Sequence, residues 1–117
     1  MKSKIKGELG EETAVKYLQK QKYKIIQRNF KSVTGEIDII ALDGKTLVFV
    51  EVKARTSGFF GLPREAVNEK KQYKIARTAQ DFMRQHKVYS LKTRFDVVEV
   101  TPEKVNHIKD AFCTELL

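Results

Sequence analysis

The sequence predicts a single α/β domain in which a central mixed β-sheet is flanked by helices. Three observations indicate this class: two segments with helical spacing of apolar residues, several segments with strand patterning, and a chain of 117 residues, enough for one hydrophobic core. The expected order is helix, strand, strand, strand, helix, strand. This order implies an antiparallel meander that is extended through a crossover helix.

The first helix is expected from about Ile5 to Lys20, where small and apolar residues recur every three or four positions. The residues on its inner side are Gly7, Ala14, Val15 and Leu18. A short strand over Tyr23 to Gln27 is expected next. Two longer strands, Glu36–Leu42 and Lys45–Lys53, follow and are expected to form a hairpin. The dipeptide Asp43-Gly44 between them is typical of tight hairpin turns, in which glycine readily adopts a positive φ.

Three charged residues are expected to share one face of this hairpin. Depending on the register, the turn places Asp38 opposite Phe49 or Glu51. Because strand side chains alternate with period two, Asp38, Glu51 and Lys53 point to the same side in both registers. The opposite side is expected to be apolar and is made of Ile37, Ile39, Val48, Val50 and Val52.

The second half of the chain supplies the crossover helix and a further strand. The helix is expected to begin at Pro63, which is tolerated in a first helical turn, and to run to about His86. Its inward residues are Val67, Ile75, Ala79 and Phe82. Arg94–Val100 is apolar on both faces, which is typical of a central strand. Val105–Phe112 fits either a short strand or a terminal helix.

The charged side of the hairpin fits a divalent-metal site. Phosphodiester cleavage needs a hard cation to polarise the phosphate and ready a water, and converging carboxylate oxygens bind such a cation. Asp38 and Glu51 supply these oxygens, and Lys53 is placed to orient the nucleophile or stabilise charge on the phosphate. The alternative is a solvated sheet face whose ion pairs contribute little.

Glu11 lies near the centre of the apolar side of the first helix. A glutamate aimed at a sheet is costly to bury unless it is paired or binds a metal. Either Glu11 approaches the metal site, or the helix rotates slightly and Glu11 reaches solvent, where a carboxylate in the first turns also favours the helix dipole.

Basic residues are expected to bind a polyanion. The net charge is +8, and neutralisation of phosphates releases counterions and drives binding. Lys71 is on the inner side of the second helix, so its ammonium either reaches the site or a substrate phosphate, or extends to solvent. Lys70, Lys74, Arg77 and Arg84 form an outer stripe that either contacts a nucleic acid backbone or is a solvated face.

Several classes of protein are excluded or disfavoured. The apolar runs are too short to span a bilayer, and no apolar stretch of a signal peptide follows the basic N-terminal residues. Cys113 is the only cysteine, so an intrachain disulfide is impossible and a reducing cytoplasm is the expected location. His86 and His107 are isolated and make no zinc pattern with Cys113.

The two hairpin strands carry a recognisable motif. The strings Gly35-Glu36-Ile37-Asp38-Ile39-Ile40 and Phe49-Val50-Glu51-Val52-Lys53-Ala54-Arg55 resemble the YraN-like family of small bacterial proteins. That family is assigned to the PD-(D/E)XK nuclease superfamily and is similar to archaeal Holliday junction resolvases. Further matches cover nearly the whole chain: Glu11-x-x-Ala14 with Tyr17-Leu18, Arg28-Asn29, Lys71-Gln72, Arg94 to Val98, and Ile108 to Phe112.

The resemblance implies a restriction-endonuclease-like core. It implies that Asp38 and Glu51 are metal ligands, that Lys53 is the catalytic lysine, and that Glu11 is the helix glutamate of resolvase-like members. Gly35 stands where the superfamily has a proline.

The function expected from the motif and the charge is a Mg²⁺- or Mn²⁺-dependent endonuclease acting on DNA, with branched or structured DNA as a candidate substrate. The alternative is a nucleic-acid-binding adaptor without cleavage, in DNA processing or uptake. The residues expected to steer the phosphate backbone are Lys53, Arg55, Lys70, Lys71, Lys74 and Arg77. A homodimer would suit the paired cuts of a junction resolvase.

Overall fold

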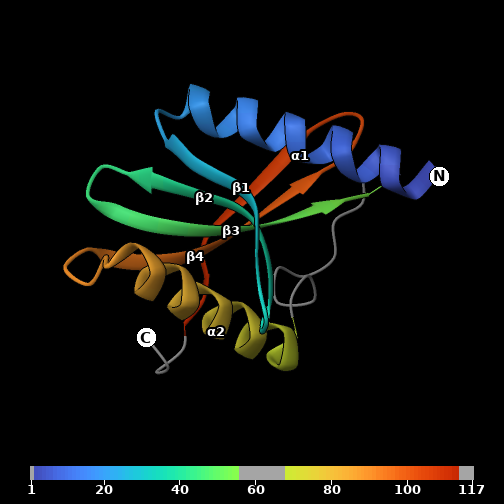
Figure 1. Cartoon of the computed structure of the whole chain (residues 1–117). Helices are drawn as coiled ribbons and strands as arrows, with labels where there is room; N and C mark the ends of the chain where they lie inside the picture. Colours follow the sequence, from blue (N-terminus) through green and yellow to red (C-terminus); the bar gives the residue numbers. More distant parts are fainter. Residues whose placement is uncertain (1, 56–67, 114–117) are drawn as a thin grey trace.

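The computed structural model describes residues 2–55 and 68–113, with side chains from Leu9 onward. The described part of the chain forms, in order, α1 (Lys2–Lys20), β1 (Lys24–Ser32), β2 (Gly35–Asp43), β3 (Thr46–Ala54), α2 (Glu69–His86), β4 (Lys92–Val100) and β5 (Val105–Phe112) (Figure 1). The predicted α/β class and element order are confirmed, and the ambiguous segment at the end is a strand. Pro63 and Val67 lie outside the described residues, and so does the side-chain position of Gly7. The predicted continuous helix from Pro63 to about His86 is wrong at Asn68, because Asn68 is extended and caps a helix that begins at Glu69.

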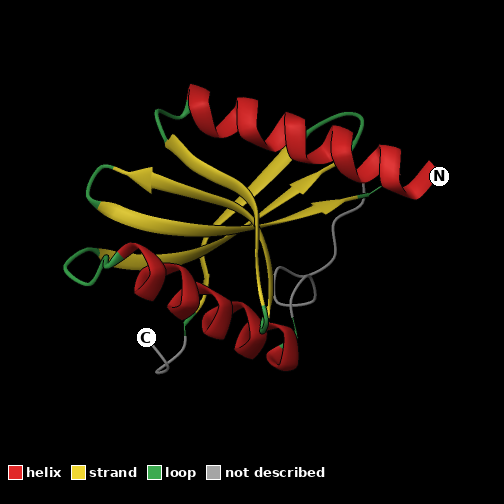
Figure 2. Cartoon of the chain, in the orientation of Figure 1, coloured by secondary structure: helices red, strands yellow, loops and turns green. Residues whose placement is uncertain are grey.

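The five strands lie in the sheet in the order in which they occur in the chain. β1, β2 and β3 are antiparallel neighbours, β3 and β4 are parallel, and β5 returns antiparallel to β4. α2 provides the crossover between the two parallel strands. Figure 2 shows the sheet between the two helices, with α1 on one face and α2 on the other. This mixed sheet with flanking helices is consistent with a restriction-endonuclease-like core.

Because both faces of the sheet are covered, alternate residues of an interior strand enter different cores. Val48 and Val50 pack with Ala14 and Leu18 of α1, whereas Phe49 between them packs against Phe82 of α2. β4 behaves likewise, as its apolar pattern predicts: Phe95 and Val97 lie on the α2 side, and Val98 and Val100 on the α1 side.

The ends of α2 are set by residues suited to them. At its start, the Asn68 side chain accepts a hydrogen bond from the Lys71 backbone N–H at 2.9 Å, which satisfies a donor that the first turn leaves open. At its end, Lys87 adopts the left-handed conformation, and its N–H bonds back to the last turn. The Asn68 cap thus orders the first turn of α2, which contains Lys71.

The predicted face of Ile37 is wrong. Ile39, Val48 and Val50 lie in the α1-side core and Val52 packs against it, as expected, but Ile37 belongs to the core beneath α2. The pairing of β2 with β3 ends at Ile39 and Val50, while β2 stays paired with β1 as far as Gly35. Freed from β3, this end of the β1–β2 hairpin bends toward α2, as Figure 1 shows.

Hydroxyl groups hold the bent hairpin end on α2. Ser32 and Thr34 both donate to Asp81 Oδ2, at 2.7 and 2.8 Å, and Thr34 also contacts the Thr78 hydroxyl at 3.0 Å. These bonds lower the pKa of Asp81. The bend therefore has a specific polar anchor, which strand alternation cannot predict.

α1 approaches the end of β3 very closely at Gly10. A Cβ added there would lie 2.8 Å from the Ala54 Cβ, closer than two such atoms normally come. Glycine inside a helix costs about 1 kcal/mol relative to alanine. Its presence in the middle of α1 is explained by this contact.

Candidate functional site

Asp38 and Glu51 meet where β2 separates from β3. The last paired positions of the two strands are Ile39 and Val50, and Asp38 and Glu51 are their neighbours just beyond the end of the pairing. Asp38 Oδ2 accepts a hydrogen bond from the Val52 backbone N–H at 2.8 Å, so the carboxylate replaces the backbone partner that β2 no longer offers. This hydrogen bond therefore holds the Asp38 side chain beside Glu51.

The two carboxylates disfavour each other's charge. Burial, and then the neighbouring Glu51, raise the pKa of Asp38 to about 7. A proton or a cation placed between two such oxygens relieves the repulsion. Carboxylate oxygens are the ligands that hard divalent cations prefer, so the pair fits Mg²⁺ or Mn²⁺. No cluster of three or more Asp, Glu, His or Cys that could hold a metal occurs in residues 2–55 and 68–113, so the pair offers two protein carboxylates.

Two lysines complete this cluster, which we call the hairpin site: Asp38, Glu51, Lys53 and Lys71. Lys71 Nζ lies 3.0 Å from Glu51 Oε1. Burial, followed by the contact with Lys71, lowers the pKa of Lys53. Burial alone would lower the pKa of Lys71 as well, but its contacts with Lys53 and Glu51 outweigh this and raise it. Lys53 and Lys71 therefore lie close enough to shift each other's pKa.

Glu11 is half-buried on α1 and approaches the sheet beside Asn29. Asn29 lies between the pairs Arg28–Ile39 and Phe30–Ile37, so it stands opposite Asp38 on the neighbouring strand. With its amide nitrogen turned toward the carboxylates, Asn29 donates to Glu11 Oε1 at 2.9 Å and to Glu36 Oε1 at 3.3 Å. Glu36 in turn contributes to the raised pKa of Asp38.

Sequence reasoning gave no role to Asn29 or Glu36. The one signal in the sequence was an asparagine within a strand, because asparagine tolerates the left-handed region better than most residues. In the structure Asn29 does adopt this conformation, with a φ of 53°. The strand β1 also runs on through Asn29 to Ser32, well beyond the predicted end at Gln27.

The predicted phosphate-binding residues of α2 fall into two groups. Lys71 turns inward to Glu51, whereas Lys70, Lys74 and Arg77 are exposed on α2. Arg84, also on the predicted stripe, pairs with Asp81 at 3.3 Å on the helix surface. The structure thus brings one α2 lysine into the hairpin site and leaves the others in contact with solvent. Arg55 lies at the end of β3, where its Nε donates to Glu99 Oε2 at 3.1 Å.

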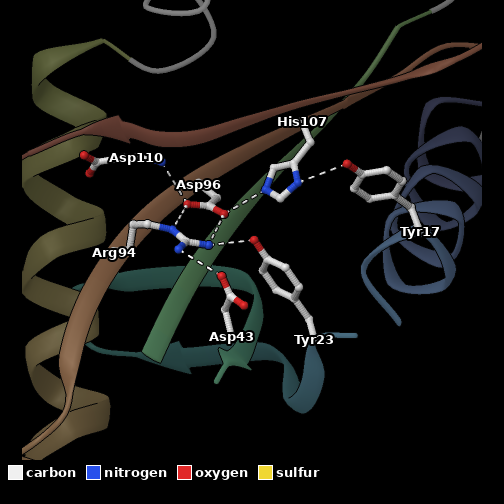
Figure 3. Close-up of polar contacts among 7 residues, drawn as sticks. All are labelled: Tyr17, Tyr23, Asp43, Arg94, Asp96, His107 and Asp110. Atoms are coloured by element: carbon white, nitrogen blue, oxygen red, sulfur yellow. Dashed lines mark hydrogen bonds and ion pairs between the residues drawn. The ribbon is translucent and has the colours of Figure 1, made fainter. Parts of the chain in front are cut away.

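A second polar cluster lies on β4 and β5 and is centred on Asp96 (Figure 3). We call it the Asp96 network. Asp96 is fully buried and accepts from Arg94 Nε at 2.8 Å, from the Asp110 backbone N–H at 3.0 Å, and bonds His107 Nε2 at 2.7 Å. Burial alone would raise the pKa of Asp96, but the bonds from His107 and Arg94 outweigh it and hold this pKa below its usual value.

The outer members of this network reach two other parts of the chain. Arg94 also donates to Asp43 Oδ2 at 3.1 Å and to the Tyr23 hydroxyl at 2.6 Å. His107 Nδ1 lies 3.2 Å from the Tyr17 hydroxyl on α1. Burial, and then the nearby Asp96, raise the pKa of Tyr23 to about 12. His107, which is isolated in the sequence, therefore links β5 to β4 and α1.

Comparisons with known proteins agree on one family. The model of the uncharacterised protein family UPF0102 matches residues 10–100. The chain is 49% identical over 116 residues to a UPF0102 protein of Caldanaerobacter subterraneus subsp. tengcongensis, covering 93% of this chain and 95% of that protein. It is 44% identical over 112 residues to one of Persephonella marina, covering 96% and 97%. It is 46% identical over 118 residues to one of Alkaliphilus oremlandii, covering 96% and 100%.

No helix among the described residues is both long enough and apolar enough to cross a membrane. The family match spans most of the α/β domain, including both strands of the hairpin site. The chain therefore belongs to the uncharacterised protein family UPF0102.

Proposed function

We propose that this protein is a divalent-metal-dependent endonuclease of the PD-(D/E)XK type that acts on DNA. One observation carries the proposal: two carboxylates, Asp38 and Glu51, face each other beside Lys53 at the point where two strands separate. A fold gains no stability from facing like charges, so such a pair is more often retained for chemistry.

Each residue of the hairpin site has a role that its contacts support. Asp38 and Glu51 would hold Mg²⁺ or Mn²⁺, which when bound supplies Lewis-acid polarisation of the phosphate and a more acidic water. Lys53 orients the attacking water and stabilises charge on the phosphate. Lys71 offers a second cation to the phosphate. Glu11, which is outside the hairpin site, would assist metal binding directly or through water. Its hydrogen bond from Asn29, which also donates to Glu36, supports this role.

A nucleic-acid-binding adaptor without cleavage is the second candidate. It is favoured by the net charge of +8 and by the exposed lysines and arginine of α2. The two candidates differ in what they require of Asp38 and Glu51. A pure binder has no use for carboxylates that repel phosphate, whereas a nuclease needs them.

The test is metal-dependent cleavage of duplex, single-stranded, flap and four-way DNA, with RNA counterparts. We expect Asp38→Asn and Glu51→Gln to abolish cleavage with Mg²⁺ or Mn²⁺ and to bind DNA at least as tightly as the parent. Lys53→Ala should cut about 10²–10³ times more slowly, the usual loss for one charge-stabilising donor. Ca²⁺ should support binding without turnover.

Matched controls remove the same charges elsewhere. Glu103→Gln and Lys92→Ala change exposed residues outside the hairpin site and should cut at the parental rate. Cleavage that persists undiminished in the Asp38→Asn, Glu51→Gln double variant would come from a contaminant and would end the assignment. If the parent protein binds DNA but cuts no substrate with any metal, the nuclease proposal is wrong and the adaptor is the remaining candidate. Paired cuts in a four-way junction would require two copies of the chain, which light scattering of the DNA complex measures.

A further inference from the structure

We infer that Glu99 is a positioning residue that holds the Arg55 guanidinium ready to bind a backbone phosphate next to Lys53. The inference deepens the proposed function and rests on it, because it assumes that the substrate is a nucleic acid. It concerns binding of the substrate strand and involves no metal.

Glu99 is a fully buried carboxylate with both oxygens engaged. Its Oε2 accepts from Arg55 Nε at 3.1 Å and its Oε1 from Asn106 Nδ2 at 3.1 Å. A buried carboxylate is strongly unfavourable without such partners. Arg55 is different, since about a third of its side chain is exposed (35%). One end of this ion pair is therefore locked inside the fold and the other reaches the surface.

The backbone places this ion pair beside the hairpin site. In the parallel ladder, Glu99 of β4 is the direct neighbour of Lys53 of β3. The Arg55 backbone N–H donates to the Val100 oxygen at 2.8 Å, which continues the ladder one residue past the end of β3. Since side chains alternate along a strand, Arg55 lies on the same side of the sheet as Glu51 and Lys53.

A guanidinium fixed through Nε is suited to bind phosphate. Its planar group carries five N–H donors, and among the described residues Glu99 is the only side chain that binds it, through Nε. The orientation of the plane is set when the protein folds, so less side-chain entropy is lost when phosphate binds. A solvated surface arginine has no such support. The geometry therefore favours a specific phosphate contact at Arg55.

The test is DNA affinity in EDTA, where cleavage plays no part, over a range of salt concentrations. Arg55→Ala should weaken binding about tenfold, the loss of one charge-assisted hydrogen-bonded contact. The log–log salt slope should become shallower by about 0.9, which corresponds to one phosphate. Lys16→Ala, an equal charge change on the exposed side of α1, should alter neither value by as much.

Glu99→Gln separates positioning from simple charge. This substitution raises the net charge by one, so long-range electrostatics alone predicts tighter binding to DNA. Positioning predicts the opposite: binding should weaken toward the level of Arg55→Ala, and the double variant should bind no more weakly than Arg55→Ala alone. Circular dichroism at the assay temperature checks that each variant is folded. If Glu99→Gln does not fold, Arg55→Lys takes its place, because lysine keeps the charge but has no Nε to be held by Glu99.

Each outcome decides the question. Weaker binding by Glu99→Gln, or an Arg55→Lys variant as weak as Arg55→Ala, supports the inference. Tighter or unchanged binding by folded Glu99→Gln, additive losses in the double variant, or parental binding by Arg55→Lys overturns it. A parent that binds no nucleic acid at low salt overturns the proposed function as well. A parent that binds as expected but never cuts overturns the nuclease and leaves this inference standing.

Discussion

The hairpin site and the Asp96 network use the same kinds of side chain in opposite ways. In the network, a buried aspartate is surrounded by donors, and its pKa is lowered. In the hairpin site, Asp38 faces another carboxylate, and its pKa is raised to about 7. Two aspartates on one sheet thus have pKa values shifted in opposite directions. The Asp96 network surrounds its buried carboxylate with donors, whereas the hairpin site leaves two carboxylates facing each other, as the proposed metal site would require.

The largest effect on stability is expected from breaking the Asp96 network. Asp96→Asn removes the buried anion that Arg94 and His107 share, so the free energy of unfolding should fall by about 3–5 kcal/mol. Urea denaturation measures it. The control is Asp110→Asn, which changes an exposed carboxylate but keeps the backbone N–H that binds Asp96. A loss as small as that of the control would mean that the network contributes little.

The same aspartate predicts how stability depends on pH. A carboxyl whose folded pKa is lowered stabilises the fold above its unfolded pKa, near 3.9, and loses this contribution as the pH falls through the folded pKa. The gap in unfolding free energy between the parent and Asp96→Asn should therefore shrink progressively below about pH 4. Urea denaturation at stepped acidic pH tests this. A gap that stays constant down to acid unfolding would contradict it.

A change of opposite sign is expected at the hairpin site. Without metal at pH 8, Asp38→Asn removes one of two facing charges while its amide oxygen can still accept from the Val52 N–H. The free energy of unfolding should rise by about 1 kcal/mol, the scale of repulsion between nearby charges in contact with water. Glu103→Gln is the control and should change little. A variant clearly less stable than the parent would show that Asp38 supports the fold after all.

An effect of similar size but of opposite sign concerns the outer edge of the Asp96 network. Tyr17→Phe removes the hydroxyl that contacts His107 Nδ1, and a single such hydrogen bond contributes about 0.5–1.5 kcal/mol. Thermal or urea denaturation gives the value. Tyr73→Phe, on the exposed side of α2, is the matched control and should be neutral. Equal effects of the two substitutions would place Tyr17 outside the network.

Residues close in sequence or on one strand were the predictable part of the candidate site. Alternation alone placed Glu51 and Lys53 on one side of β3, and the Asp43-Gly44 turn brought Asp38 to the same end of the hairpin. The register, which the sequence left open, proved to be the one that sets Asp38 beside Glu51. The crossover helix followed from its spacing of apolar residues, whereas its caps at Asn68 and Lys87 were not predicted.

Contacts between distant segments were not predictable in this way. His107 contacts Asp96 because β5 pairs with β4. The sequence of β5 fits a strand and a helix equally well, so this pairing could not be predicted. The position of Ile37 depends on a bend that is held by hydrogen bonds from hydroxyl groups of the hairpin to Asp81 on α2. Nothing in the sequence around Glu99 indicates that it is buried, since only the fold brings Arg55 and Asn106 to its two oxygens.

The glycine at position 10 has a consequence for how variants of this protein would behave. The added methyl group of Gly10→Ala would meet Ala54, which stands between Lys53 and Arg55 on β3. The helix would have to move outward, or the strand end would have to give way, and either shift would disturb both cations together. Under the proposed function, a substitution that raises helix propensity and changes no charge would then weaken DNA binding. Gly10 therefore sets the distance between α1 and the end of β3 that carries Lys53.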